Sequence, residues 1–200
     1  MKKNTICFVS MLFVAACMTL PTSSEYVARG DGYVKDNKFD KAIAAYNKAL
    51  QLNPGNLEAR SSRGVTHYFA GHYALAQQDF EYVLTKNPYH TDAYSAYGST
   101  LAARGDFKNA LEVLDRAIAA EPNKPENYVS RAGVYFMLGK YEDAVKNYTA
   151  VLEAFPAAEV FSARGAAYLQ MGKKELAEQD FQTAKSGKYP ATLSVYAELK

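Results

Sequence analysis

The stretch GVYFMLGK at residues 133–140 holds two glycines followed by a lysine, the residue types of a phosphate-binding loop. A Walker loop places four residues between its glycines and a Ser or Thr after its lysine. Its backbone N–H groups then surround a phosphate, and the hydroxyl reaches Mg²⁺. Here five residues separate Gly133 from Gly139, and Tyr141 follows Lys140. The stretch therefore predicts no nucleotide site, and its glycines need another explanation.

The remaining residues with potentially reactive side chains do not form a recognisable active site. The histidines His67, His72 and His90 lack the HExxH spacing and any other metal-ligand spacing. No serine lies in the G-x-S-x-G context of a nucleophile elbow. Adjacent carboxylates such as Glu142 and Asp143 lie where a helix is expected to begin, and there they complement the helix dipole. We expect a protein that is not an enzyme and that binds no metal or cofactor.

The N-terminal residues MKKNTICFVSMLFVAAC have a basic start and a short apolar run that ends at Cys17. A permanent membrane-spanning helix needs about 20 apolar residues, more than this run supplies. Residues 1–16 are therefore predicted to be a cleaved signal peptide, and the protein to be secreted across the inner membrane. After cleavage the chain has 21 basic and 21 acidic residues, so its formal charges balance. Because nucleic-acid binding needs a basic excess, we expect no nucleic-acid partner.

Residues Val14 to Cys17 resemble the lipobox of bacterial lipoproteins. That resemblance implies that Cys17 becomes the first residue of the mature chain and is acylated, with residues 17–22 as a short tether. It also implies that Met18 favours sorting to the outer membrane, facing the periplasm. Several acyl chains would hold the protein at a membrane firmly. The alternative is ordinary signal cleavage nearby, which leaves Cys17 as a free thiol.

A repeat of 34 residues, shortened once to 33, organises the rest of the chain. Each unit has the apolar spacing of two helices, and a proline follows the second helix in the first four units. In the second to fifth units a glycine stands where the chain turns between the helices. Thr22 and Glu25 can cap the first helix, and Pro125 suits the first turn of another. The recurring small residues are Gly30, Gly64, Gly98, Ala132 and Gly165; the alanines are Ala42, Ala76, Ala110, Ala144 and Ala177; the large residues are Tyr46, Phe80, Leu114, Tyr148 and Phe181; the turn glycines are Gly71, Gly105, Gly139 and Gly172; the prolines are Pro54, Pro88, Pro122 and Pro156.

These columns resemble those of the tetratricopeptide repeat, over residues 23–190. The resemblance implies an all-α, right-handed α-solenoid of five helix-turn-helix units, and a short capping helix is expected at 191–200. Gly139 is then the turn between paired helices, and Gly133 is a packing glycine beside the small-residue column. Unit two departs from the pattern at Arg60 and His67, and unit five at Lys174. The predicted units are 23–56, 57–90, 91–124, 125–157 and 158–190.

Arginine directly precedes the small residue in most units. Reflecting a helical hairpin through its turn places Arg63 opposite Asp79 and Arg164 opposite Asp180. We predict that both are semi-buried ion pairs. In the third unit both partners change together, to Tyr97 and Val113, which agrees with pairing. The alternative is a ladder of arginines that binds an anionic ligand.

The resemblance implies that the first helices of the units line a concave groove. Its stripe is neutral and apolar, and lacks the Lys/Asn arrangement with which some relatives clamp the C-terminal carboxylate of heat-shock chaperones. We expect it to bind a peptide segment or protein partner. The predicted groove residues are Val27, Asp31, Val34, Lys35, Ser61, Val65, Tyr68, Phe69, Ser95, Ser99, Ala102, Val129, Gly133, Phe136, Met137, Ser162, Ala166, Leu169 and Gln170.

Taken together, these features predict an envelope adaptor, a scaffold for protein–protein interaction. It is similar to the small repeat lipoproteins of bacterial envelopes, among them pilotins of type IV pili and adaptors of peptidoglycan enzymes. The alternative is a structural envelope lipoprotein that forms homo-oligomers through the same groove.

Overall fold

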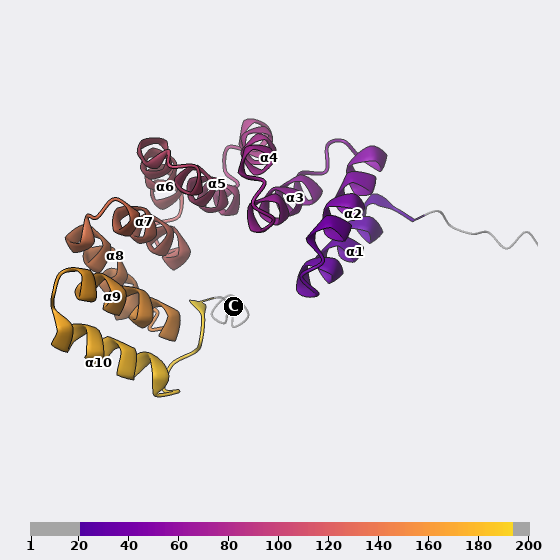
Figure 1. Ribbon diagram of the computed structural model, residues 1–200. Helices are drawn as coiled ribbons and strands as arrows, with labels where there is room; N and C mark the ends of the chain where they lie inside the picture. The colour runs from indigo at the N-terminus through magenta and orange to yellow at the C-terminus, as the bar shows by residue number, and fades with distance from the viewer. Residues whose placement is uncertain (1–20, 194–200) are drawn as a thin grey trace, which may run out of the picture.

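The computed structural model describes residues 21–193, and the long elements of regular secondary structure within them are all α-helices. The helices of this part follow one another as five pairs, each joined by a tight turn (Figure 1). The predicted all-α repeat solenoid is confirmed, and each predicted unit contains one pair. The first helices are α1 (Ser23–Lys35), α3 (Leu57–Phe69), α5 (Thr91–Ala103), α7 (Pro125–Met137) and α9 (Ala158–Gln170); the second helices are α2 (Phe39–Leu52), α4 (Tyr73–Lys86), α6 (Phe107–Ala120), α8 (Tyr141–Ala154) and α10 (Lys174–Lys185).

Both ends of the chain extend beyond the described residues. Cys17, the signal peptide at 1–16 and most of the tether at 17–22 lie outside them, as does most of the capping helix expected at 191–200. What the sequence indicates for these segments stays a prediction. Between residues 21 and 193, no helix combines the length and hydrophobicity that crossing a bilayer requires.

Local chemistry explains where the helices begin and turn. Thr22 Oγ1 accepts a hydrogen bond from the Glu25 amide at 3.3 Å, and the Glu25 carboxylate accepts one from the Thr22 amide at 2.7 Å, which confirms the capping box. Pro125 is the first residue of α7, where its missing N–H is tolerated. In the first unit Asn37 makes the turn, with φ of 56°. The later turns use glycines with φ between 73° and 82°, a region that glycine enters without steric cost: Gly71, Gly105, Gly139 and Gly172.

The small-residue column lets the two helices of a pair approach each other. A Cβ built on Gly98 would stand 2.6 Å from Leu114 Cγ, and one on Gly64 would stand 3.0 Å from Phe80 Cε1. The predicted packing role of this column is therefore confirmed. Gly133 differs, because a Cβ at that position would meet no neighbouring atom within 4 Å. The prediction that Gly133 is a packing glycine was wrong: it lies next to Ala132, the true member of the column, and faces open space.

Two bidentate ion pairs join the helices of units two and five. Arg63 donates from Nε and Nη2 to the two carboxylate oxygens of Asp79, at 2.8 and 2.6 Å. Arg164 binds Asp180 in the same way, at 2.8 Å for both bonds. Both aspartates are buried, so the predicted semi-buried pairs are confirmed.

The same column of arginines also reaches back to the preceding unit, which the sequence did not indicate. Arg63 Nη1 donates to Asn47 Oδ1 at 2.6 Å, and Arg131 Nη1 donates to Asp115 Oδ1 at 2.6 Å. Within its own unit Arg131 donates from Nε and Nη2 to Asn147 Oδ1. Arg63 and Arg131 thus each join three helices. Because these donors are used inside the protein, the structure favours a structural role over an anion-binding ladder.

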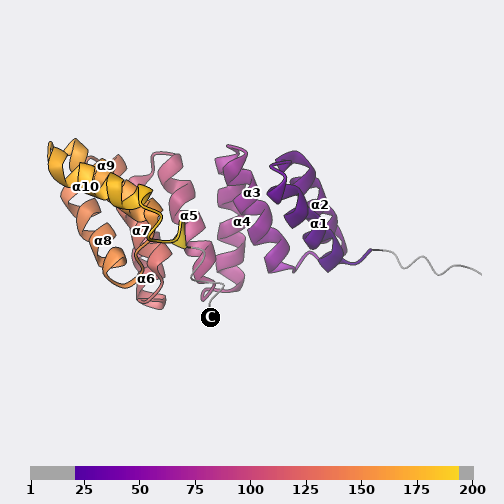
Figure 2. The same ribbon diagram turned by 90° about the horizontal axis from the view of Figure 1, so that it is seen from below.

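In space the units follow an arc, with the first helices on its inner side and the second helices outside (Figure 1). Seen from below, the pairs stand in a row from α1 to α10 (Figure 2). Each second helix packs on the first helix of the following unit, so every unit shares its apolar face with its neighbours. Among the inner helices, direct packing is closest between α5 and α7 and slightest between α7 and α9.

The chain after α10 returns to the start of α9. No side chain caps this helix, since its N-cap residue is Ala157. Instead the amide of Ala158 donates to the carbonyl of Pro190 at 2.8 Å, and that of Glu159 donates to the carbonyl of Ala191 at 3.1 Å. Backbone from residues 190–191 therefore satisfies two amides that a helix N-terminus leaves free.

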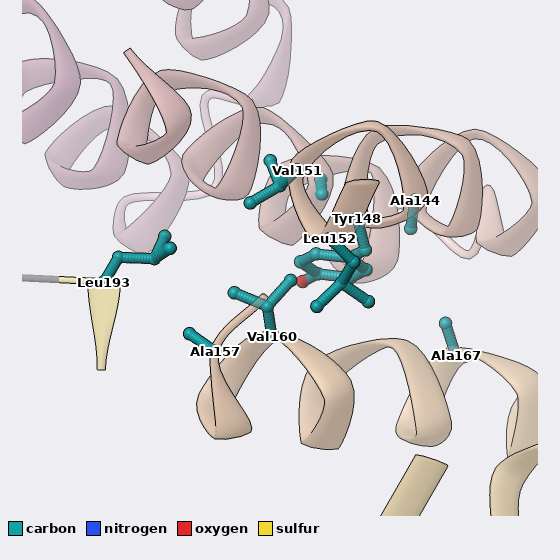
Figure 3. Packing of buried hydrophobic residues seen from close by; sticks show 9 residues of the cluster. Ala144, Tyr148, Val151, Leu152, Ala157, Val160, Ala167 and Leu193 are labelled. Atoms are coloured by element: carbon teal, nitrogen blue, oxygen red, sulfur yellow. The ribbon is translucent and has the colours of Figure 1, made fainter. Parts of the chain in front are cut away.

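Leu193 completes this contact. Its side chain is 3% exposed and belongs to the apolar cluster that includes Val151 of α8 and Val160 of α9 (Figure 3). Its amide donates to the Glu159 carboxylate at 2.7 Å. Residues 187–193 thus cover the last unit as repeat arrays require, but they do so without α-helical structure.

Candidate partner-binding groove

The predicted groove residues all belong to the inner helices. Two of them, Val27 and Ala102, are only 4% and 3% exposed, because they pack into the cores between units. They offer a partner almost no surface. The accessible members are called the inner wall below. Its exposed residues are Asp31, Lys35, Phe69, Met137, Ser162, Leu169 and Gln170; its half-buried residues are Val34, Ser61, Val65, Tyr68, Ser95, Ser99, Val129, Gly133, Phe136 and Ala166.

A pocket of about 290 Å³ opens in this wall between α1 and α3. It exists because two units stack, since neither helix pair encloses it alone. The sequence predicted Asp31, Val34, Lys35, Ser61 and Val65 as groove residues, and the structure brings all five together here. The lining that sequence reasoning missed is Tyr46, Ser62 and Thr66.

Tyr46 holds the carboxylate of Asp31 in place. Its hydroxyl donates to Asp31 Oδ1 at 2.7 Å, while its ring is buried beneath Gly30 and is 1% exposed. Burial raises the pKa of the Tyr46 hydroxyl, and the bond to Asp31 raises it further, so Tyr46 stays a neutral donor. In the described part of the chain, Asp31 Oδ2 has no hydrogen-bond or ion-pair partner. One carboxylate oxygen is therefore fixed by the fold and the other is available.

Aromatic side chains lie farther along the wall. The Tyr68 ring meets the ring of Phe69 edge-on at 5.5 Å and that of Tyr73 at 5.7 Å. Phe69 also stacks on Phe39 of the preceding unit, with ring centroids 6.2 Å apart, yet it remains exposed. Exposed aromatic residues on a rigid surface are the type that anchors protein interfaces.

An acidic residue stands in the first turn of each inner helix from α3 to α9, a column that the sequence analysis did not identify. The spacing that could have revealed it is the same repeat period. Each member stands three positions before a predicted wall residue, so helical geometry places both on one face. Asp92 is bound by Lys124 and Glu159 by the Leu193 amide. The column is Glu58, Asp92, Glu126 and Glu159.

Metal-binding sites gather several His, Cys, Asp or Glu side chains, and the structure describes such side chains between residues 21 and 193. There is no cluster of three or more potential metal ligands in that part of the chain. His67 and His72 place their Nδ1 atoms 3.4 Å apart at the turn of the second unit, but His67 is buried in the fold. The geometry is that of a binding surface.

Stacked helix pairs around an accessible inner wall define a helical-repeat solenoid, a class of protein that binds other polypeptides. Four sequence models of the tetratricopeptide repeat match residues 30–71, 62–125, 101–167 and 158–186. Together they span almost the whole described chain, and the protein belongs to the tetratricopeptide repeat family. Proteins of this family mediate protein–protein interactions and are typically non-enzymatic scaffolds.

Individual relatives agree with this assignment. Human tetratricopeptide repeat protein 6 is 32% identical over 151 residues, which cover 74% of this chain but 29% of the relative. The chain thus spans less than a third of that relative's length. A tetratricopeptide repeat protein from Parabacteroides merdae superposes with a TM-score of 0.75 at 29% identity, covering 89% of this chain and 69% of that one.

One similar structure was solved with a peptide. The first repeat domain of Spaghetti (RPAP3), bound to an HSP90 peptide of sequence SRMEEVD, covers 58% of this chain and 93% of its own. Its TM-score is 0.56 and its identity to this chain is 25%.

Proposed function

We propose that this protein is a non-catalytic adaptor of the bacterial cell envelope that holds a segment of another protein against its inner wall. The observation that carries the proposal is the pocket between α1 and α3, which combines an oriented carboxylate, hydroxyls and apolar walls close to exposed aromatic rings. The fold does not need these groups to be accessible. The peptide-bound structure of Spaghetti supports a peptide as the ligand class, because it shares this fold over more than half of the chain.

The envelope part of the proposal rests on the first seventeen residues. A basic start, a short apolar run and Val14-Ala15-Ala16-Cys17 are the features by which a lipoprotein is processed and acylated. Growth with radiolabelled palmitate tests this directly. We expect label in the parent and in Cys7→Ser, and none in Cys17→Ser. Label that persists in Cys17→Ser would remove the lipid anchor from the proposal.

The inner wall is tested with the purified full-length chain and a displayed library of random peptides. Peptides enriched by the parent should bind Tyr68→Ala about tenfold more weakly or worse, since aromatic anchors dominate such interfaces. Tyr89→Ala is the matched control: Tyr89 is 86% exposed in the loop between α4 and α5 and is not one of the wall residues. If both variants lose peptide affinity equally, or if neither loses affinity, the assignment of the inner wall as the binding surface is contradicted.

Light scattering of the same preparation distinguishes the adaptor from a self-associating scaffold. An adaptor should remain a monomer over a wide concentration range. A concentration-dependent dimer that Tyr68→Ala dissociates would show that the wall serves a second copy of the chain instead.

A further inference from the structure

The inner wall is bordered by negative charge that the neutral stripe read from the sequence does not include. Its charged residues are Asp31 and Lys35 on α1, and the first-turn carboxylates of α3, α5, α7 and α9 extend its edge. Lys124 neutralises Asp92. Even with that pair removed, acidic residues outnumber the single lysine on this face. Charges on a shared face act together to attract a partner of opposite sign.

Within this wall, Asp31 is the carboxylate best placed to recognise a ligand group. The bond from Tyr46 fixes its orientation at 2.7 Å, so little side-chain entropy remains to be lost on binding. Asp31 lines a pocket whose sides include Val34 and Val65. Apolar sides beside a terminal carboxylate match a long aliphatic stem that ends in a cation, as in lysine or arginine.

We infer that the inner wall selects a basic peptide segment and that one of its Lys or Arg side chains enters the pocket between α1 and α3. This inference rests on the proposed function and specifies the partner's chemistry. The stem packs between Val34 and Val65, and the cationic head donates to Asp31 Oδ2. Ser61 and Ser62, which also line the pocket, are the nearby hydroxyls that can accept further hydrogen bonds from the head.

Lys35 limits what the pocket accepts. It lies one helical turn after Asp31, lines the same pocket, and forms no ion pair with Asp31 in the described structure. A second cation entering beside the first would meet this ammonium group. The pocket therefore holds one basic side chain, and the remaining basic residues of the segment lie along the carboxylates Glu58 and Glu126.

The test uses the full-length chain and the tightest peptide from the random library. Its basic residues are replaced one at a time by norleucine, which keeps the stem and removes the cation, and Kd is measured by fluorescence polarisation. One replacement should weaken binding to the parent about fivefold, the upper range for a partly exposed ion pair. The same replacement should have no effect on binding to Asp31→Asn. Asp40→Asn is the matched control, because it changes the net charge equally at an exposed site on α2.

The outcomes separate this inference from the proposed function. If the library yields no peptide whose binding depends on Tyr68, the peptide-binding function itself fails. If such peptides are found but lack enriched Lys or Arg, or if norleucine weakens binding equally in Asp31→Asn and the parent, the basic pocket is overturned while the groove stands. A loss of affinity in Asp40→Asn as large as in Asp31→Asn would assign the effect to net charge and contradict the pocket.

Discussion

The hydroxyl of Tyr97 donates a 2.7 Å hydrogen bond to Glu81 Oε1, from the position that arginine occupies in the neighbouring units. Glu81 in turn occupies the position of Asn47, which Arg63 binds across the same kind of junction. Tyr97 thus keeps the bond to the preceding unit, while Val113 leaves it no polar partner within its own unit. Tyr97 and Arg63 differ in chemistry, but each forms a hydrogen bond to the preceding unit.

Removing this hydroxyl should loosen the junction between units two and three. Tyr97→Phe is expected to lower the free energy of unfolding by about 0.5–1.5 kcal/mol, the net value of one hydrogen bond. Tyr97→Arg should lower the free energy of unfolding by less than Tyr97→Phe, because a guanidinium can also reach Glu81. Urea unfolding curves of the three proteins measure the difference. A Tyr97→Phe curve that superimposes on the parent's would show that the bond contributes nothing.

Loss of a buried aspartate should cost far more than loss of an exposed one. Asp79→Ala leaves the guanidinium of Arg63 without its carboxylate, and we expect a loss of about 3–5 kcal/mol. Asp115→Ala removes the partner of Arg131, but that carboxylate is 59% exposed compared with 4% for Asp79, so at most about 1 kcal/mol is expected. Chemical denaturation of both variants checks the ranking. Similar losses would show that burial does not govern these pairs.

A pair of Gly→Ala substitutions isolates the close approach of two helices. Both Gly98 and Gly133 lie inside first helices, so alanine brings the same gain in helix propensity at each. Only at Gly98 does the new Cβ press on Leu114. Gly133→Ala should therefore raise the melting temperature, and Gly98→Ala should be less stable than it by about 1–3 kcal/mol. Equal stability of the two variants would mean that the small-residue column tolerates a methyl group.

Acid should destabilise the second unit through His67. Burial lowers the pKa of His67; the nearby Arg63 and His72 lower it further, while Asp79 opposes them. The unfolded chain then takes up a proton at higher pH than the folded chain. The stability that the neutral, buried His67 contributes to the folded state is complete above about pH 6.5. It is lost as the pH falls through the folded-state pKa. His67→Gln should flatten the decline in unfolding free energy below about pH 6.5; an unchanged slope would contradict the assignment.

The segment after α10 should slow hydrogen exchange of the backbone amides at the start of α9. Leu193→Ala empties a buried site, and we expect a local loss of about 2–5 kcal/mol. The amides of Ala158 and Glu159 should then exchange hydrogen faster, because their acceptors lie in the released segment. Hydrogen-exchange mass spectrometry measures this. Leu52→Ala, at a side chain that is exposed, is the control and should leave exchange in α9 unchanged.

Much of the fold follows from residue spacing because each unit repeats the same local geometry. A helix, a glycine turn and a second helix set which residues face each other, so Gly98 meets Leu114 and Arg63 meets Asp79 at a separation of sixteen residues. The aromatic and apolar stripe of the inner helices follows from the same helical period. Five of the residues that this stripe predicted for the groove line the pocket between α1 and α3.

Contacts between units depend on how closely neighbouring pairs stack, which is set by the sum of many side-chain volumes. That stacking buried Val27 and Ala102, brought Tyr97 to Glu81, and opened the pocket beside Asp31. The contact of Leu193 with α9 also depends on tertiary structure. The N-terminus of α9 has amides that no side chain caps, and α9 packs only slightly against α7. The chain's periodicity determined the units and their internal pairs. Their curvature, their junctions and the accessible carboxylate were decided by packing in three dimensions.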